Sequence, residues 1–443
     1  MKIKSVNRLQ GNLTLPGDKS ISHRAAMLSA LATGDEIRVE NFAASADCAS
    51  TLACLKKLGV RIRREGTMVY IKGVGKTGFR VPQENLDCGN SGTTMRLMSG
   101  ILAGQNFDSV LTGDGSLESR PMKRVIEPLM LMGGRIESEN NRAPLRISGK
   151  NPLHSINYPM NVASAQVKSC VLLAGLNAAG NTVICNPKST SPVSTSRNHT
   201  ELMLKYLGAD LEERFIESEG GYVHEISIGG DSKLTARNLN VPSDISSAAF
   251  FLAAAACLKG SDLTLKNVGL NPTRRAVVDV LQSFGADIEI LDQREVCNEI
   301  VGDLRVTGGE NLSAKAAKNI IEGDVIANLI DEIPILAIFA TQLENGLEIR
   351  NARELRVKES DRIKAIVENL RAMNADAEEF EDGLRVGKSD LKGAPIDSFG
   401  DHRIAMAFAV AGLFAEGETE IKGAECAAVS FPDFFEKLGE VAV

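Results

Sequence analysis

The chain has 443 residues, of which 43% are hydrophobic and 24% are charged, as in a globular protein large enough for two or more cores. A formal net charge of −7 argues against nucleic acid or an anionic membrane as the main partner. The first ten residues lack the apolar stretch of a signal peptide, and the longest apolar run, Ala248–Leu258, is too short to span a bilayer. We therefore expect a soluble, cytoplasmic protein.

The stretch 15–31, LPGDKSISHRAAMLSAL, predicts a helix that is small or apolar on every side and hence buried. Asp18 or Ser20 can cap its N-terminus. Its first turns nevertheless carry Lys19, Ser20 and Arg24. Cations, a hydroxyl and free backbone N–H groups at the start of a buried helix favour a phosphate or carboxylate site. A capped helix with solvated charges is the plain alternative for this one stretch.

The same pattern, a small-residue helix followed by glycine, a strand and a turn, occurs six times along the chain. The expected helices are Ser22–Leu31, Gly92–Gly104, Ala163–Ala178, Ile245–Leu258, Ile333–Leu343 and Ile404–Phe414. The strands expected after them are Asp35–Asn41, Asp108–Gly113, Asn181–Asn186, Ser261–Asn267, Gly346–Asn351 and Glu418–Gly423. A second, amphipathic helix follows each strand, and two short strands follow five of these helices. The pattern predicts an α/β protein of six βαβαββ-like units.

The sixth unit stops before its two strands, whereas the N-terminal residues supply strand-like segments that have no unit of their own. We infer that the N-terminus completes the C-terminal unit. Two domains of three units each follow, residues 16–239 and residues 1–15 with 240–443, joined by a two-strand hinge near 15–17 and 239–242. A cleft on a double hinge is a natural ligand trap. A single-layer solenoid of βα repeats is the alternative, although solenoid repeats are usually shorter and more regular.

Basic side chains recur near the starts of the buried helices and in the loops beside them. They are Lys19, Arg24, Arg120, Arg197, Lys358, Arg362 and Arg403. If these starts face one cleft, an acidic protein carries a basic pocket suited to small substrates with several negative charges, such as phosphates. A surface ion pair is the commoner role for any one arginine. Seven cations at equivalent places in the repeats are harder to explain in that way.

Other kinds of chemistry have weak support. The eight cysteines are scattered without a C-x-x-C pair, and the five histidines show no ligand spacing, so we expect reduced thiols and no metal site. The segment 73–78 matches G-x-G-x-x-G, but Phe79–Pro82 cannot open the helix that a dinucleotide site requires.

Six motifs together carry a family resemblance: LPGDKSISHR, GNSGTTMR, ESRPM, SAQVKS, RVKESDR and GDHRIAMAF. Over essentially the whole chain they resemble the 5-enolpyruvylshikimate-3-phosphate (EPSP) synthases, and the SAQ and SRNHTE variants resemble the class II branch. The resemblance implies a two-domain inside-out α/β barrel that closes on shikimate-3-phosphate and phosphoenolpyruvate. It also implies that EPSP and phosphate are formed without a metal or cofactor, on the route to aromatic amino acids.

The resemblance implies a set of binding residues by motif match. Those expected to hold shikimate-3-phosphate are Lys19, Ser20, Arg24, Ser164, Ala165, Gln166, Arg197, Asp331 and Lys358. Those expected to hold phosphoenolpyruvate are Lys19, Gly92, Arg120, Gln166, Glu359, Arg362 and Arg403. One departure is Val429, where the family often has a lysine. Because Gly92 is glycine rather than alanine, the resemblance also implies sensitivity to glyphosate, a competitor of phosphoenolpyruvate.

The implied reaction needs a proton delivered to the methylene carbon of an enol ether and another removed from the attacking hydroxyl. Asp331 is the candidate base, and Glu359 is the candidate acid, with Lys19 assisting. The arginines would hold the phosphate charge as the tetrahedral intermediate collapses. Which carboxylate acts in which half-reaction stays open at this point.

Two other functions remain open for this chain, which we expect to be a monomer. A UDP-N-acetylglucosamine enolpyruvyl transferase would resemble Lys-Asn rather than Lys-Ser at the first motif and would carry a reactive cysteine before Arg-Pro. The loop Gly113–Arg120 has no cysteine. A non-catalytic protein that binds a phosphate ligand would not need both Asp331 and Glu359 beside the cations.

Overall fold

The computed structural model describes residues 1–190, 196–309, 312–313 and 319–443. The chain forms two compact units. Unit 1 comprises Met1–Pro16, Pro242–Glu295 and Ile300–Val443, and unit 2 comprises Gly17–Val241 and Val296–Glu299. The short segment Val296–Glu299 contains the end of one strand, the start of the next and the turn that joins them, and it belongs to unit 2 although the rest of both strands belongs to unit 1. The repeat pattern does not indicate this. The hinge at 15–17 and 239–242 stays a prediction.

Unit 2 contains three four-stranded sheets with the orders β16-β3-β5-β4, β6-β7-β9-β8 and β11-β13-β15-β14, and a small pair β10-β12. Its helices are α1 (Lys19–Leu31), α2 (Ala46–Lys57), α3 (Gly92–Ala103), α4 (Gly115–Ser119), α5 (Lys123–Leu131), α6 (Ala165–Gly175) and α7 (His199–Tyr206). Its strands are β3 (Ile37–Glu40), β4 (Arg61–Glu65), β5 (Met68–Lys72), β6 (Leu86–Asp87), β7 (Asp108–Thr112), β8 (Arg135–Glu139), β9 (Arg142–Ser148), β10 (Leu153–His154), β11 (Asn157–Pro159), β12 (Ala178–Ala179), β13 (Asn181–Cys185), β14 (Leu211–Ser218), β15 (Gly221–Gly229) and β16 (Leu239–Asn240).

Unit 1 contains two four-stranded sheets, β18-β19-β17-β2 and β20-β21-β23-β22, and a three-stranded sheet β1-β25-β24. Its helices are α8 (Ile245–Cys257), α9 (Ala276–Ser283), α10 (Val325–Leu329), α11 (Ile333–Ala340), α12 (Arg362–Ala372), α13 (His402–Gly412) and α14 (Phe434–Val441), with 3-10 turns η1 (Arg353–Val357) and η2 (Ala424–Val429). Its strands are β1 (Lys2–Lys4), β2 (Gln10–Thr14), β17 (Asp262–Gly269), β18 (Asp287–Val296), β19 (Glu299–Thr307), β20 (Ile320–Ile321), β21 (Leu347–Ile349), β22 (Ala377–Phe380), β23 (Gly383–Val386), β24 (Pro395–Asp397) and β25 (Glu418–Lys422).

The main sheets share one pairing scheme. A short strand lies parallel to the strand after the buried helix, as β6 lies parallel to β7 and β20 to β21. The opposite side of the central strand is antiparallel, as in β9 beside β7. The N-terminal strands enter two different sheets of unit 1: β1 pairs antiparallel with β25, and β2 pairs parallel with β17. The first short strand therefore stands in the sixth unit and the second in the fourth.

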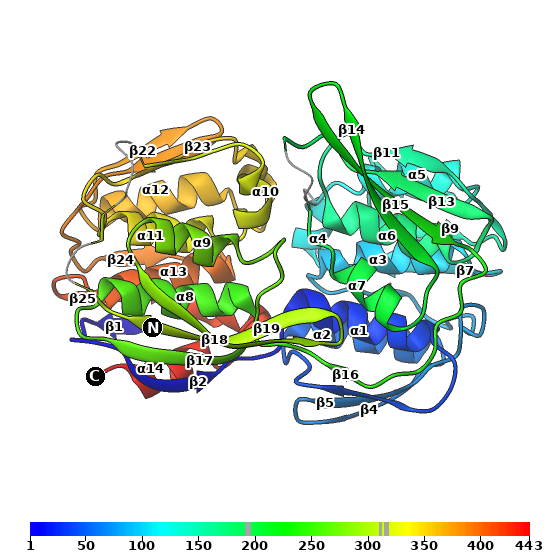
Figure 1. Ribbon diagram of the computed structural model, residues 1–443, viewed down its shortest axis with the longest axis horizontal. Helices are drawn as coiled ribbons and strands as arrows, with labels where there is room; N and C mark the ends of the chain where they lie inside the picture. Colours follow the sequence, from blue (N-terminus) through cyan, green and yellow to red (C-terminus); the bar gives the residue numbers. More distant parts are fainter. Residues whose placement is uncertain (191–195, 310–311, 314–318) are drawn as a thin grey trace. The chain divides into compact units, whose positions relative to one another are not determined.

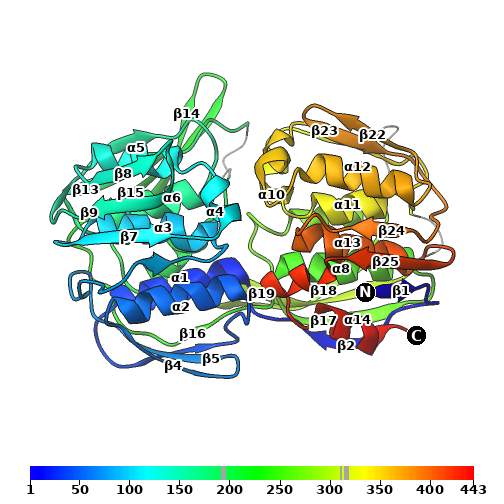
Figure 2. The ribbon, with the colours of Figure 1, turned by 180° about the vertical axis from the view of Figure 1, so that it is seen from behind.

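Three helices in each unit are almost wholly buried and lie inside the ring of sheets (Figures 1 and 2). In unit 1 these are α8, α11 and α13, which contact one another; in unit 2 they are α1, α3 and α6. Small residues on all sides explain this burial, because alanine, serine and glycine let sheets and neighbouring helices approach closely. α8, for example, carries the buried run Ala253–Ala256. The six helices expected from the sequence are all present, with ends displaced by a few residues.

The start of α1 resolves one open point. Asp18 is the N-cap, since its carboxylate accepts from the backbone N–H of Ile21 at 2.8 Å, and Ser20 lies inside the helix. All eight cysteines are free thiols. None of the helices in the described part of the chain combines the length and the apolar character that a membrane crossing requires.

Candidate functional site

The first group of predicted residues lies at the start of α1 in unit 2. The Lys19 ammonium is 2.9 Å from Asp47 Oδ2 on α2, and the Lys19 side chain keeps 22% of its surface exposed. Asp18 is the N-cap of α1, so Lys19 is the first residue of the helix. The helix dipole favours anions at this end, as the charge of Lys19 does. The ion pair with Asp47 therefore fixes the direction of the Lys19 ammonium group at the surface of unit 2.

Arg24 is fixed one turn further along α1. Its Nε donates to Thr200 Oγ1 at 2.6 Å, its Nη2 to Ser169 Oγ at 2.9 Å and its Nη1 to the Ser20 carbonyl at 2.8 Å. Burial lowers the pKa of this guanidinium to about 10, so Arg24 remains charged at neutral pH. Two hydroxyls and a carbonyl therefore hold a desolvated cation in one orientation, which is what selective recognition of an anion requires.

The start of α3 gathers the next group. Ser91 caps the helix, and Gly92 is its first residue. A Cβ at position 92 would lie 2.9 Å from Arg96 Nη1 and 3.6 Å from Arg120 Nη1. Glycine therefore leaves space between the backbone and two guanidinium groups, and an anion can approach the backbone N–H groups there.

Hydrogen bonds orient the side chains around this space. Arg96 Nη1 donates to Gln166 Oε1 at 2.6 Å, and Gln166 Nε2 donates to Thr93 Oγ1 at 2.9 Å, which fixes the orientation of the amide. Arg120 Nη2 donates to Asn90 Oδ1 at 2.8 Å. The predicted residues Gly92, Arg120 and Gln166 are thus brought together.

The start of α6 supplies the remaining predicted residues of unit 2. Ser164 is the N-cap, with its hydroxyl 3.5 Å from the backbone N–H of Val167, and Ala165 is the first helical residue. Arg197 is half-buried just before α7, and its charge contributes to lowering the pKa of Arg24. Ser194 and Thr195, shortly before Arg197, lie outside the described residues.

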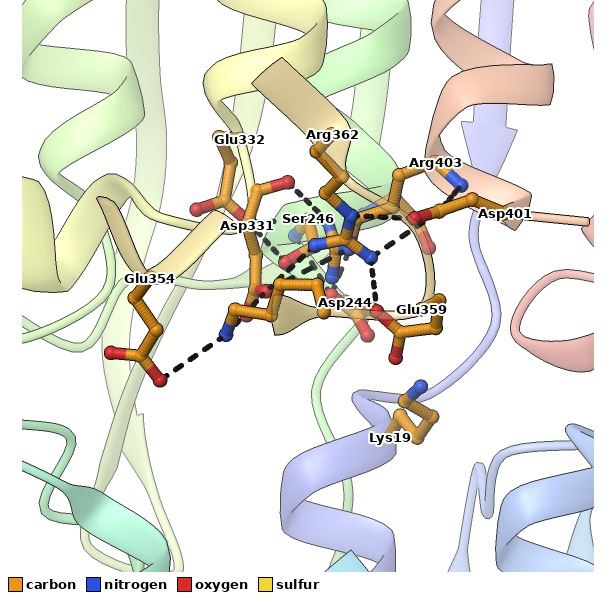
Figure 3. Close-up of polar contacts among 12 residues, drawn as sticks. Lys19, Asp244, Ser246, Asp331, Glu332, Glu354, Glu359, Arg362, Asp401 and Arg403 are labelled. Carbon is orange, nitrogen blue, oxygen red and sulfur yellow. Dashed lines mark hydrogen bonds and ion pairs between the residues drawn. The ribbon is translucent and has the colours of Figure 1, made fainter. Parts of the chain in front are cut away.

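The predicted residues of unit 1 are centred on Arg362 (Figure 3). Its Nε donates to Asp401 Oδ2 at 2.7 Å, its Nη2 donates to Glu359 Oε2 at 2.7 Å, and its Nη1 is 3.5 Å from Asp331 Oδ1. Burial alone would lower the pKa of Arg362, but Asp401, Glu359 and Asp331 outweigh burial and raise it. Burial likewise opposes the charge of Asp401, but Arg362 keeps the pKa of that carboxyl below its usual range.

Asp331 lies between three predicted cations, just before α11. Besides Arg362, the Lys358 ammonium and Arg403 Nε are each 3.9 Å from Asp331 Oδ1. Arg403 Nη1 also donates to the backbone carbonyl of Asp331 at 2.7 Å. Glu359 lies on the other side of Arg362. The arrangement can bind an anion and hold two carboxylates at separate places beside it.

The structure therefore brings all five predicted residues of unit 1 into one network: Asp331, Lys358, Glu359, Arg362 and Arg403. In unit 2 the predicted residues form separate groups at the starts of α1, α3 and α6. Several members of these networks had no predicted role, namely Asp47, Asn90, Arg96, Ser169, Thr200, Arg274, Glu332 and Asp401. Most of these residues lie inside the quoted motifs or next to them in the sequence. A search of the residues next to each motif could therefore have identified them. Val429, at the end of η2, stands where the family often has lysine.

Two α/β units with buried helices whose starts carry cations define the class: an α/β protein of repeated folding units with cationic groups suited to small anionic substrates. Known sequences and structures then give the family. The sequence model of EPSP synthase (3-phosphoshikimate 1-carboxyvinyltransferase) matches residues 3–438. The chain belongs to the EPSP synthase family, whose members are transferases of the shikimate pathway and of aromatic amino acid biosynthesis.

Individual relatives agree over the full length. The 3-phosphoshikimate 1-carboxyvinyltransferase of Koribacter versatilis is 47% identical over 443 residues, which is 100% of this chain and 99% of that protein. The enzyme of the same name from Pelotomaculum thermopropionicum is 50% identical over 439 residues, covering 98% of this chain and 97% of the relative. An EPSP synthase structure from Acinetobacter baumannii superposes with a TM-score of 0.85 at 42% identity, covering 100% of this chain and 98% of the other. The expected fold, the inside-out α/β barrel of this family, is confirmed.

Proposed function

We propose that this chain transfers the enolpyruvyl group of phosphoenolpyruvate to the 5-hydroxyl of shikimate-3-phosphate by addition and elimination. The products are EPSP and inorganic phosphate. Membership of the EPSP synthase family supports this activity over essentially the whole chain. The observation that carries the mechanism is the network in which Asp331 and Glu359 stand on two sides of the buried Arg362.

The residues of unit 2 supply most of the recognition of shikimate-3-phosphate in this proposal. Its phosphate and hydroxyls are held by Lys19, Ser20, Arg24, Ser164, Ala165, Gln166 and Arg197, and by Asp331 and Lys358 of unit 1. The fixed orientation of Arg24 supports this role, because a guanidinium already held by Ser169 and Thr200 loses little freedom when it binds phosphate.

Phosphoenolpyruvate is held in the same proposal by Lys19, Gly92, Arg120, Gln166, Glu359, Arg362 and Arg403. Asp331 removes the proton of the attacking hydroxyl, and Lys358 and Arg362 both lie within 4 Å of its carboxylate. Glu359, with Lys19 assisting, delivers a proton to the methylene carbon. In the elimination, the new methyl group loses a proton to a base of the site as the C–O bond to phosphate breaks. Arg120, Arg362 and Arg403 stabilise the charge that develops on the leaving phosphate.

A turnover assay tests this function directly. Purified protein is mixed with shikimate-3-phosphate and phosphoenolpyruvate, and released phosphate and EPSP are measured. Equal amounts of both products are expected. UDP-N-acetylglucosamine in place of shikimate-3-phosphate serves as the control acceptor: turnover with it alone would reassign the substrate, and binding without turnover of either would leave a non-catalytic binding protein.

The remaining parts of the proposal concern assembly and motion. We expect a cytoplasmic monomer, which light scattering on the purified protein and cell fractionation can check. Closure about the crossings at 15–17 and 239–242 should reduce the radius of gyration when shikimate-3-phosphate is added. A radius that stays the same in solution scattering would argue against a hinge.

A further inference from the structure

Glu332 follows Asp331 directly and is 1% exposed, at the N-cap position of α11. None of the roles implied by the family motifs falls on it. A carboxylate that is removed from water costs free energy unless nearby cations and donors compensate for its charge. The groups around Glu332 therefore indicate what this side chain does.

Two arginines and one hydroxyl surround a single oxygen of Glu332 (Figure 3). Glu332 Oε1 accepts a hydrogen bond from Ser246 Oγ on α8. The same oxygen is 3.8 Å from Arg274 Nη1 and 3.7 Å from Arg403 Nη1. Arg274 is itself buried, and its Nη2 donates to Ser246 Oγ at 2.6 Å. One carboxylate thus lies between two guanidinium groups that come from separate segments of unit 1.

Arg403 is held on one side only. Its Nη1 donates to the Asp331 carbonyl at 2.7 Å and faces Glu332, and its Nε lies 3.9 Å from Asp331 Oδ1. Within the described residues no hydrogen bond or ion pair involves Arg403 Nη2. Because the contacts of Arg403 run through Nη1 and Nε, its Nη2 is available for a substrate anion. Asp331 and Glu332 determine the orientation of the guanidinium group.

The charges explain why a glutamate is needed at this position. Arg274 and Arg403 both lie within 4 Å of one carboxylate oxygen, so the two cations are close to each other. Without the carboxylate they would repel each other in a poorly solvated place. Asp244, 3.9 Å from Arg274, compensates part of that charge. Repulsion would therefore displace Arg403, the partner with a partly exposed side chain.

We propose that Glu332 is a positioning residue for phosphoenolpyruvate: it balances the buried Arg274 and thereby fixes Arg403 for the substrate anion. The inference rests on the proposed function, since it assigns Arg403 to phosphoenolpyruvate. Glu332 itself touches neither substrate, so its effect passes through Arg403.

A double-mutant cycle tests this role, with Glu332→Gln, Arg274→Met and the double variant as its corners. The steady-state KM for phosphoenolpyruvate and the KM for shikimate-3-phosphate are measured for each, after thermal unfolding has shown which variants are folded. Each single variant leaves one charge of the pair unbalanced. We expect each to raise the KM for phosphoenolpyruvate about 10- to 100-fold and to change the KM for shikimate-3-phosphate less than about threefold. In the double variant, the KM for phosphoenolpyruvate should return most of the way to that of the unaltered protein.

The matched control is Glu344→Gln, which removes a carboxylate of the same unit from a surface ion pair with Lys388 and should leave both KM values unchanged. A cycle in which neither single variant alters the KM for phosphoenolpyruvate overturns the role of Glu332. So does a parallel rise of both KM values, or a double variant no better than the singles. If one single variant does not fold, the other single and the double variant still give the comparison. Lack of turnover in the unaltered protein would instead refute the proposed function.

Discussion

The Lys168 ammonium lies 2.5 Å from Glu201 Oε1, and neither side chain has any exposed surface. Lys168 belongs to the first turn of α6 and Glu201 to the first turn of α7. Lys168 Nζ also donates to the Ser196 carbonyl at 3.4 Å, next to Arg197. A buried ion pair is weak evidence for stability, because two desolvated charges recover little more than they lose. Its position suggests that it keeps the starts of α6 and α7 in register beside Arg24.

Lys168→Met should destabilise the protein by about 3–5 kcal/mol, since it leaves the Glu201 carboxylate buried without its cation. Denaturant unfolding measures this loss. The double variant Lys168→Met with Glu201→Leu removes both charges and should be more stable than the single variant. A single variant as stable as the unaltered chain would show that the Glu201 carboxylate is compensated by other groups.

Lys19→Met should abolish most turnover while the protein stays folded. The Lys19–Asp47 pair is partly solvated, and such pairs contribute about 1 kcal/mol or less to stability. Circular dichroism and kcat together check the prediction. Turnover close to that of the unaltered protein would remove Lys19 from the proton transfer.

Asp331→Asn and Glu359→Gln should each lower kcat by about 10²- to 10⁴-fold, the usual effect of a positioned acid or base. These substitutions keep the size of the side chains beside Arg362 and remove only the ionisable group. Single-turnover kinetics with both substrates is the measurement. If both variants bind more weakly but retain the maximal rate, the two carboxylates serve binding and not proton transfer.

His23 should make the protein less stable in mild acid. Its Nδ1 is 2.7 Å from Thr51 Oγ1, and burial lowers its pKa to about 3, with Lys19 and Arg24 opposing and Asp47 favouring the charged form. An unfolded histidine titrates near about 6.5. Between these values the unfolded chain binds a proton that the folded chain does not, so the free energy of unfolding falls as the pH falls. The expected contribution is about 1.4 kcal/mol per pH unit.

Unfolding curves between pH 6.5 and pH 4 for the His23→Asn protein check this slope, since asparagine takes up no proton. The variant should lose less stability per pH unit than the unaltered protein. His154→Asn is the control, because His154 is exposed. Identical slopes for the His23 variant and the unaltered protein would contradict the prediction.

Gly92→Ala should weaken glyphosate binding by a larger factor than phosphoenolpyruvate binding. The new Cβ would lie 2.9 Å from Arg96 Nη1, so that guanidinium must shift, and Arg120 is close behind it. Glyphosate is longer than phosphoenolpyruvate, so the smaller space should weaken its binding more. Competition assays give both affinities. Equal losses, or an unaltered enzyme that ignores millimolar glyphosate, would show that Gly92 does not control the difference and would direct attention to Val429.

Local chemistry was sufficient to predict the starts of the buried helices. An aspartate before Lys19 and small residues after Arg24 indicate a capped, buried helix, and α1 has that form. The anion site at its start stays a prediction. The partners of these residues could not be predicted in the same way. Ser169 and Thr200 meet Arg24 across separations of 145 and 176 residues, and such contacts depend on how helices pack in three dimensions. The sequence indicated which groups carry charge, but not which neighbours fix their orientation.

The pairing of β1 with β25 bears on how the chain folds as it is synthesised. Lys2 lies opposite Glu420, so β1 has no partner in its sheet until β25 has left the ribosome. Apart from Val296–Glu299, unit 2 is one continuous stretch and can begin to fold while the rest is still being made. β1 is made before β25, so it must stay unpaired while the residues between these two strands are made. Its brevity, three residues with both lysines exposed, lowers the risk of pairing wrongly during that wait.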